Sequence, residues 1–121
     1  MAVFVYRSAS GTDDSFTPRP GPAPAKDDTV GSKRGLSTFD RPDRFSDQDR
    51  VQEIDLERLS GPLRGLRDVD GHVSIVPVNS SGAVDDAALK EWASFRKSGR
   101  QHPFTKIVRD AVTSDDIRRK K

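Results

Sequence analysis

Short stretches rich in β-branched and aromatic residues recur along the chain, a composition typical of β-strands, and the first, AVFVYR, is apolar enough for a strand buried on both faces. Strands are predicted at residues 2–7, 36–39, 51–56 and 72–78. In the last of these, the two-residue period places Val73 and Ile75 on one face and His72 and Ser74 on the other. We therefore expect a sheet with an apolar face and, on its other side, a polar one.

Two later segments have the three- and four-residue spacing of amphipathic helices. The first is predicted at residues 85–97, with an aspartate, Asp85 or Asp86, as its N-cap. The second begins at Pro103, and its apolar residues recur at positions 104, 107, 108, 111 and 112. Trp92 is predicted to lie in the core, and His102 is predicted to have a capping or surface role at the start of the second helix rather than to act in catalysis.

A third run of apolar residues is harder to assign. Leucines at positions 56, 59, 63 and 66 are spaced for one face of a helix. Gly61 and Pro62 interrupt the run, so one or two helical turns are predicted within residues 57–66. Asp70 and Gly71 then predict a tight turn before the next strand. Together these elements predict an α+β fold.

Two stretches lack such periodicity. Residues 8–34 are rich in Gly, Ser, Asp and Pro, with prolines at alternate positions from 18 to 24, so a long Pro/Gly-rich loop is predicted there. Residues 113–121 end in Arg and Lys and are predicted to form a frayed basic tail. The whole chain, residues 1–121, is short enough for a single domain.

Composition narrows the possible function classes. The chain has no cysteine and two histidines, so thiol chemistry is excluded and no metal site is predicted. No stretch is long and apolar enough for a membrane span, and no signal peptide is recognisable, so we expect a cytoplasmic protein with no membrane partner. Lys and Arg outnumber Asp and Glu by only 21 to 19, and the two signs are interspersed. Charge alone therefore does not predict a nucleic-acid partner.

The chain lacks the Walker, GxGxxG, HExxH, GxSxG and aromatic RNA-binding motifs. Three short blocks do combine polar residues with predicted strands: VYR at Val5–Arg7, GLSTFDR at Gly35–Arg41 and HVSIVP at His72–Pro77. Their order resembles that of the YR, GxSxFDR and HxxIxP segments in the ADP-ribosyltransferase-like toxin family, typified by a small type VI secretion effector of Pseudomonas. The resemblance spans most of the chain, as blocks separated by unrelated loops.

The resemblance implies a small split, bent antiparallel β-core with short flanking helices, and NAD as the substrate. It implies that Arg7 binds the NAD phosphates and adenosine ribose, for which a planar guanidinium is suited. It further implies that Ser37 or Thr38 orients the nicotinamide ribose. Because neighbouring strand residues face opposite ways, Ser37 is the better candidate. Arg41 is a further candidate for the NAD phosphates.

His72 matches the histidine of the HxxIxP segment. The resemblance implies that it hydrogen-bonds a ribose hydroxyl or accepts a proton from the acceptor, so that His72, Ser37 and Arg7 form the catalytic set. Classical ADP-ribosyltransferases use a glutamate to stabilise the oxocarbenium-like transition state. No ExE or QxE segment is present here, so whether catalysis is retained stays open.

The function implied by the resemblance is that of an NAD-dependent ADP-ribosyltransferase-like toxin that inhibits the growth of a target cell. A cognate antitoxin or immunity protein would neutralise it, and the macromolecular acceptor, a protein or a nucleic acid, is not specified. Because the classical glutamate is missing, the alternative is a noncatalytic nucleotide- or nucleic-acid-binding module on the same fold. A third possibility is an interaction protein that acts through its Pro-rich loop and basic tail.

Overall fold

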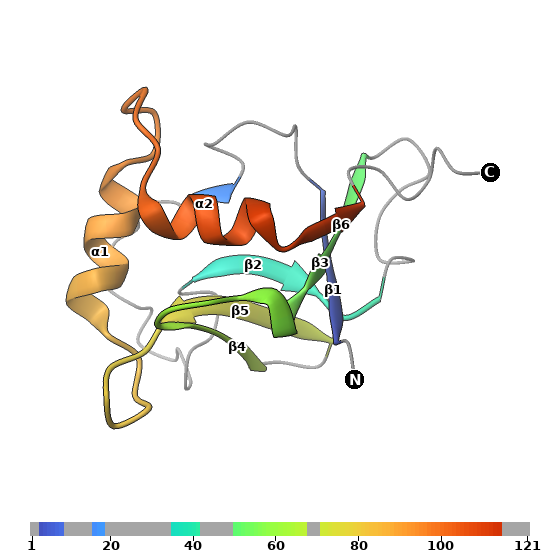
Figure 1. The fold of residues 1–121 in the computed structure, drawn as a ribbon, viewed down its shortest axis with the longest axis horizontal. Coiled ribbons are helices and arrows are strands. Elements are labelled where there is room, and N and C mark those ends of the chain that lie inside the picture. Colours follow the sequence, from blue (N-terminus) through green and yellow to red (C-terminus); the bar gives the residue numbers. More distant parts are fainter. Residues whose placement is uncertain (1–2, 9–15, 19–34, 42–49, 68–70, 115–121) are drawn as a thin grey trace.

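The computed structural model of the chain describes residues 3–8, 16–18, 35–41, 50–67 and 71–114. The elements in chain order are β1 (Phe4–Ser8), β2 (Leu36–Phe39), β3 (Val51–Asp55), a 3₁₀ turn (Leu56–Arg58), β4 (Leu63–Arg67), β5 (His72–Pro77), α1 (Asp86–Ser94), α2 (Pro103–Asp110) and β6 (Val112–Ser114). Within these residues the strands form one antiparallel six-stranded sheet in the order β4-β5-β2-β1-β3-β6. The predicted α+β class is confirmed (Figure 1).

The sheet changes direction between β2 and β1. These neighbours pair at one register position, Tyr6 opposite Phe39, whereas β1 and β3 align from Phe4 to Ser8. In Figure 1, β2, β5 and β4 run across the view, while β1 and β3 run steeply up it. The sheet therefore consists of two parts that are joined at a narrow seam between β1 and β2.

The helices and one face of the sheet enclose a small core. Val5 and Ile54 lie opposite each other on β1 and β3, and with Ile75 of β5 they are almost completely buried. Trp92 of α1 lies in the same cluster and is fully buried, as predicted. Its indole Nε1 donates to the Thr105 hydroxyl of α2 at 2.9 Å, which ties the two helices together.

Part of the predicted loop at residues 8–34 belongs to the core. Phe16 and Thr17 are only 2% and 3% exposed. The Thr105 hydroxyl lies 2.8 Å from the Thr17 hydroxyl and donates to the Phe16 carbonyl at 3.2 Å, while Arg96 donates to the Thr17 carbonyl at 3.0 Å. Residues 16–18 thus anchor the long connection between β1 and β2 to the helices. The alternating prolines after Pro18 lie outside the described residues.

The helical turns predicted within residues 57–66 are wrong for the second half of that range. A 3₁₀ turn ends at Arg58, and Leu63–Arg67 form β4, which pairs with β5 along its whole length. Gly61, at φ +60°, and Pro62 redirect the chain between them. Leu63 faces the core and is fully buried, whereas Leu66 is only half-buried. The leucine spacing therefore reflects two elements and not one helical face.

Two predicted ends also differ from the structure. Helix α1 ends at Ser94 rather than near Lys97, which adopts a left-handed backbone conformation with φ 63°. The basic tail predicted at 113–121 begins too early, because residues 113 and 114 belong to β6, which pairs with β3 at the sheet edge. Residues 115–121 lie outside the described residues.

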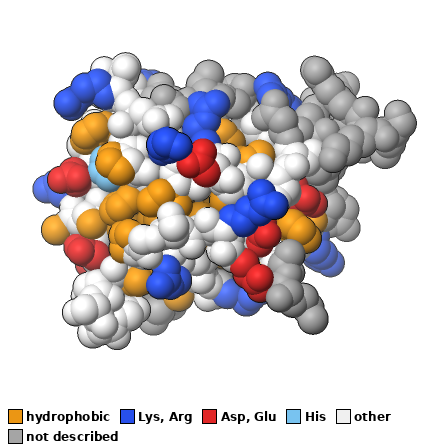
Figure 2. Space-filling model, in the orientation of Figure 1, with side chains coloured by type: hydrophobic (Ala, Val, Ile, Leu, Met, Phe, Trp, Pro, Cys, Tyr) orange, Lys and Arg blue, Asp and Glu red, His pale blue; other side chains and the backbone are white. Residues whose placement is uncertain are grey.

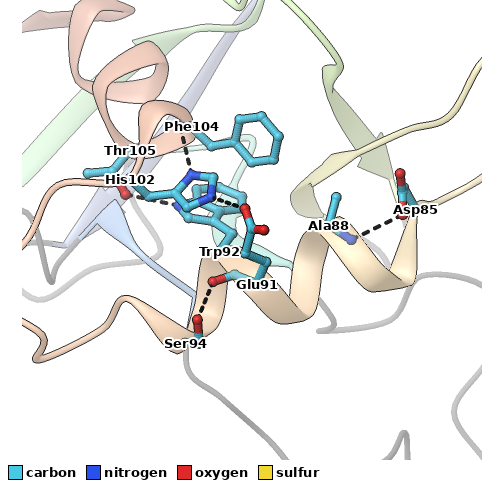
Figure 3. Close-up of polar contacts among 8 residues, drawn as sticks. All are labelled: Asp85, Ala88, Glu91, Trp92, Ser94, His102, Phe104 and Thr105. Carbon is cyan, nitrogen blue, oxygen red and sulfur yellow. Dashed lines mark hydrogen bonds and ion pairs between the residues drawn. The ribbon is translucent and has the colours of Figure 1, made fainter.

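Both helices begin with the predicted side-chain caps (Figure 3). The Asp85 carboxylate accepts the backbone N–H of Ala88 at 3.0 Å. In α2, Nδ1 of His102 accepts the backbone N–H of Phe104 at 3.0 Å. The ring proton therefore resides on Nε2, which donates to the Glu91 carboxylate at 3.0 Å. His102 is thus a structural residue that links α1 to α2.

Candidate functional site

Three of the predicted site residues meet at Ser37, on β2. The Ser37 hydroxyl lies 2.7 Å from Nε2 of His72, and the Arg7 guanidinium donates to the Ser37 backbone carbonyl at 2.7 Å. His72 is 3% exposed, while Arg7 and Ser37 are half-buried. The structure thus brings Arg7, Ser37 and His72 together from three different strands.

The sheet order explains why these residues meet, because β2 lies between β1 and β5. Ser37 is opposite Ser74 and Phe39 is opposite His72, so Ser37 and His72 are diagonal neighbours on one face. On the other side, Arg7 follows the last paired position of β1 and β2, and its side chain spans the seam to β2. Arg7 thus reaches the backbone of Ser37 across the seam, although it shares the core-facing side of β1 with Val5, whereas Ser37 and His72 lie on the opposite, polar face.

Gly35 allows β2 to approach β5 closely at this point. A Cβ atom at position 35 would lie 2.3 Å from the carbonyl oxygen of Ile75 and 2.5 Å from Cγ1 of Val76. Both distances are shorter than a Cβ can tolerate, so any larger residue would push β2 away from β5. The glycine that opens the GLSTFDR block thus maintains the strand contact that carries Ser37.

A row of side chains crosses the same face of the sheet. His72 is opposite Phe39, Phe39 is opposite Tyr6, and Tyr6 is opposite Glu53. The Phe39 and His72 rings contact each other edge to face with centroids 5.2 Å apart. At the other end, the Tyr6 hydroxyl donates to Glu53 at 3.3 Å and Thr113 donates to Glu53 at 2.7 Å. Two aromatic rings therefore lie between an imidazole and a carboxylate.

The two ends of this row are well separated. His72 and Glu53 are three strands apart, which corresponds to about 14 Å at the usual strand spacing. Burial, the negative charge of Glu53 and the hydrogen bond to Glu53 all raise the pKa of Tyr6 above its ordinary value. Tyr6 is therefore a neutral hydrogen-bond donor at physiological pH, and it fixes the orientation of the Glu53 carboxylate.

Two other predicted residues lie apart from this cluster. Thr38 faces the helices, is fully buried, and donates its hydroxyl to the Val73 carbonyl at 2.7 Å. Its oxygen is thus directed into the core and away from Ser37. Arg41 is exposed just beyond β2, next to Asp40, which forms an ion pair with Arg67 at 2.7 Å. Arg41 is therefore accessible at the rim of the site, whereas Thr38 is not.

Tyr6, Phe39 and Glu53 were not identified from the sequence as site residues. A signal for the first two was present, because both lie inside the blocks that carry the family resemblance. Alternation within Val51–Asp55 assigns Glu53 to one face of β3. This face continues across β1 and β2 to His72 because of the order of the strands in the sheet. A local sequence pattern does not specify that order.

Other features of the described residues bear on the kind of site. A pocket of about 320 Å³ lies at the other end of the polar face, beside β4 and β5, and not at Ser37. Within the described ranges, no group of three or more His, Asp or Glu side chains is arranged to hold a metal ion. The described helices are all too short or too polar to cross a membrane.

Comparisons with known proteins return no match: no family model, no curated protein and no solved structure is similar to this chain. The ground for assigning a function is therefore the arrangement of the site residues themselves. That arrangement offers a guanidinium for anions, a serine–imidazole pair for hydroxyl groups or proton transfer, and aromatic rings that lead to a carboxylate.

Proposed function

We propose that the protein is an NAD-dependent ADP-ribosyltransferase-like toxin whose site lies on the polar face of the sheet, around Ser37. The observation that supports this function most is that Ser37 contacts both other residues, His72 through its hydroxyl and Arg7 through its backbone carbonyl, although the three are far apart in the sequence. In this proposal the toxin acts in the cytoplasm of a target cell and modifies a protein or nucleic acid. A cognate antitoxin or immunity protein restrains it.

Each of the three residues has a distinct role in the proposed reaction. Arg7, anchored on the Ser37 carbonyl, faces the NAD phosphates, because a guanidinium binds oxyanions through paired N–H donors. The Ser37 hydroxyl and the His72 imidazole, 2.7 Å apart, hold the hydroxyl groups of the nicotinamide ribose. His72 also accepts the proton of the acceptor nucleophile when the glycosidic bond breaks.

The proposed reaction also needs negative charge near the developing oxocarbenium ion. Glu53 is a carboxylate on the same face, and Tyr6 and Thr113 orient it by hydrogen bonds. In this proposal NAD lies along the row between His72 and Glu53, with its nicotinamide end near the aromatic rings. Glu53 is nevertheless three strands from His72, about 14 Å, so it does not contact the ribose held at Ser37 and His72 and does not replace the glutamate that the sequence motifs lack.

The test is transfer of label from radiolabelled NAD to a cell lysate. The wild-type protein is compared with Arg7→Ala, Ser37→Ala and His72→Ala, and with Arg100→Ala as an exposed control distant from Ser37. We expect loss of transfer by about 10²-fold or more in the Arg7 and His72 variants, the range for removing a group that acts on the transition state. Arg100→Ala should retain full transfer. Unchanged transfer in His72→Ala would contradict the assigned site, and no transfer by the wild type would contradict the enzymatic function.

A noncatalytic nucleotide-binding module is the second candidate. The distance between His72 and Glu53, three strands apart, favours it, because neither residue can assist the other directly. NAD would then raise the melting temperature without any transfer of label, and a hundredfold excess over Kd corresponds to about 2.7 kcal/mol. The face shown in Figure 2 has Lys and Arg side chains interspersed with Asp and Glu, which does not favour nucleic acid as the ligand.

A further inference from the structure

The outer edge of β4 offers main-chain groups for strand pairing. Strand β4 is the end strand of the described sheet. The Pro62 carbonyl accepts the N–H of Val78 at 2.9 Å. This bond establishes which residues of β4 direct their main-chain groups toward β5 and which direct them away from it. Because main-chain groups alternate between the two sides of an antiparallel strand, those of Leu63, Gly65 and Arg67 point away from β5, and of these the Leu63 carbonyl already accepts from the Arg64 guanidinium. Gly65 is exposed, and since it has no side chain, its backbone is what solvent reaches.

A pocket of about 320 Å³ lies beside this edge. Its walls include Arg64 and Leu66 of β4 and Val76 of β5, which share one face of the sheet, and it extends to Val78 and Val84. The last two residues form an isolated β-bridge, and the N–H of Val78 also donates to the Pro62 carbonyl next to β4. Asn79 and Ser80 also line the pocket, which therefore combines apolar walls with polar groups and carries one cationic side chain, Arg64, at the β4 edge.

The charge of Arg64 has only neutral partners among the described residues. Its guanidinium donates to the carbonyls of Gly61 at 3.0 Å and Leu63 at 2.7 Å. The other arginine of β4, Arg67, is instead paired with the Asp40 carboxylate at 2.7 Å. A carboxylate brought next to Arg64 would gain a charge-assisted hydrogen bond with a cation that is already held in place. The edge thus favours an acidic partner at position 64.

We propose that β4 binds an extended, acidic segment of a partner protein as an added antiparallel strand. The residue of that segment opposite Gly65 exchanges main-chain hydrogen bonds with it. The next residue toward the C-terminus of the segment, opposite Arg64, is Asp or Glu. The residue on the other side, opposite Leu66, is a branched apolar residue that enters the pocket. From its N-terminus to its C-terminus, the recognised segment of the partner therefore consists of an apolar residue, any residue and an acidic residue.

This arrangement distinguishes the partner from a second copy of the chain. Two β4 strands paired around Gly65 would place Leu66 of one copy opposite Arg64 of the other. No carboxylate would then meet either Arg64. The pairing would also bring the two Arg64 side chains within diagonal reach of each other, which is unfavourable for like charges. The acidic heterologous strand is the better fit on charge.

The probe is an end-capped peptide, Thr-Val-Thr-Glu-Thr, with a fluorescent label, and binding to the full chain is measured by fluorescence anisotropy. Two control peptides have matched composition. One is N-methylated at the central threonine, which removes a main-chain donor, and the other exchanges Val and Glu. We expect each control to bind about tenfold or more weakly, the effect of losing one well-formed hydrogen bond or pocket contact. Amide exchange at Gly65 should slow when the first peptide binds.

A charge exchange tests Arg64 separately. Arg64→Glu should lower the affinity for the Glu peptide by about tenfold and raise the affinity for a Thr-Val-Thr-Lys-Thr peptide. Arg100→Glu should change neither affinity. Because Arg64 is exposed, the variant should melt as the wild type does, which separates lost binding from lost folding. The proposal is overturned if the N-methylated peptide binds equally well, if the reversed peptide binds better, or if sedimentation shows a β4-mediated dimer in its place. None of these outcomes depends on NAD.

Discussion

Replacement of Thr105 by valine removes one oxygen from the buried contact between the helices and residues 16–18. The Thr105 hydroxyl donates to the Phe16 carbonyl and accepts from Trp92 and Thr17, at 3.2, 2.9 and 2.8 Å. A hydroxyl has one proton and two lone pairs, so this oxygen uses its full hydrogen-bonding capacity. Valine has nearly the same shape, so the substitution removes these bonds without opening a large cavity.

The size of the effect follows from burial. Trp92 is 0% exposed, so its indole N–H loses this acceptor where water cannot replace it, at a cost of about 1–3 kcal/mol. The contacts with Phe16 and Thr17 contribute about 0.5–1.5 kcal/mol each. We therefore expect Thr105→Val to lower the free energy of unfolding by about 2–6 kcal/mol, a large part of the 5–15 kcal/mol typical of a domain.

Urea unfolding followed by tryptophan fluorescence measures this directly, because Trp92 is the one tryptophan of the chain. Thr105→Ser is the matched control. It keeps the hydroxyl and loses a methyl group, which costs about 0.8 kcal/mol. The Thr105→Ser variant should therefore be more stable than the Thr105→Val variant. The reasoning is refuted if the valine variant equals the wild type within about 0.5 kcal/mol, the range of neutral surface changes, or exceeds the serine variant.

Three further predictions concern the site and the caps. Tyr6 is the one tyrosine, and because folding raises its pKa above 10.0, the contribution of Tyr6 to stability should be fully present below about pH 10 and be lost as the pH rises further. Glu53→Gln should lower the pKa of Tyr6, as read from tyrosinate absorbance. Gly35→Ala should destabilise the fold by about 1–3 kcal/mol in thermal melting, because its Cβ would collide with the Ile75 carbonyl. His102→Ala should cost about 1 kcal/mol or more through the lost cap, and His102→Asn should recover part of it.

Each of these three has an outcome that would contradict it. If the tyrosinate titration of Glu53→Gln coincides with that of the wild type, the contact between Tyr6 and Glu53 does not exist in solution. A Gly35→Ala variant with normal melting would mean that β2 lies farther from β5 than the structure shows. Equal loss of stability in His102→Ala and His102→Asn would remove the capping role and leave only ring packing.

Much of the secondary structure was predictable because it depends on neighbours in the sequence. The strands at β2, β3 and β5 and the caps Asp85 and His102 follow from alternation and from local hydrogen bonding. Strand β4 was missed because its leucines also fit a helical spacing. The difference lies in the pairing of β4 with β5, a contact that only the folded hairpin provides.

The site was predictable to a smaller extent. The convergence of Arg7, Ser37 and His72 was inferred from the order of three sequence blocks, and the sheet order brings them together. Glu53 could not be added, since its relation to His72 runs through three strand pairings. The burial of Phe16 likewise depends on Thr105, which is 89 residues away in the chain. A lone phenylalanine in a polar segment gives no sign of such a contact.

The order of the strands has a consequence for the protein during its synthesis. Strand β1 leaves the ribosome before both of its neighbours in the sheet, and β3 must later reach back to pair with it. Helices α1 and α2, which cover the apolar side, emerge only after β5. Until then Val5, Leu36 and Ile54 have no cover, so the nascent segment is open to chaperones and proteases until the helices emerge. We therefore expect the complete sheet to be stable only after α2 and the strand β6 that follows it have been made.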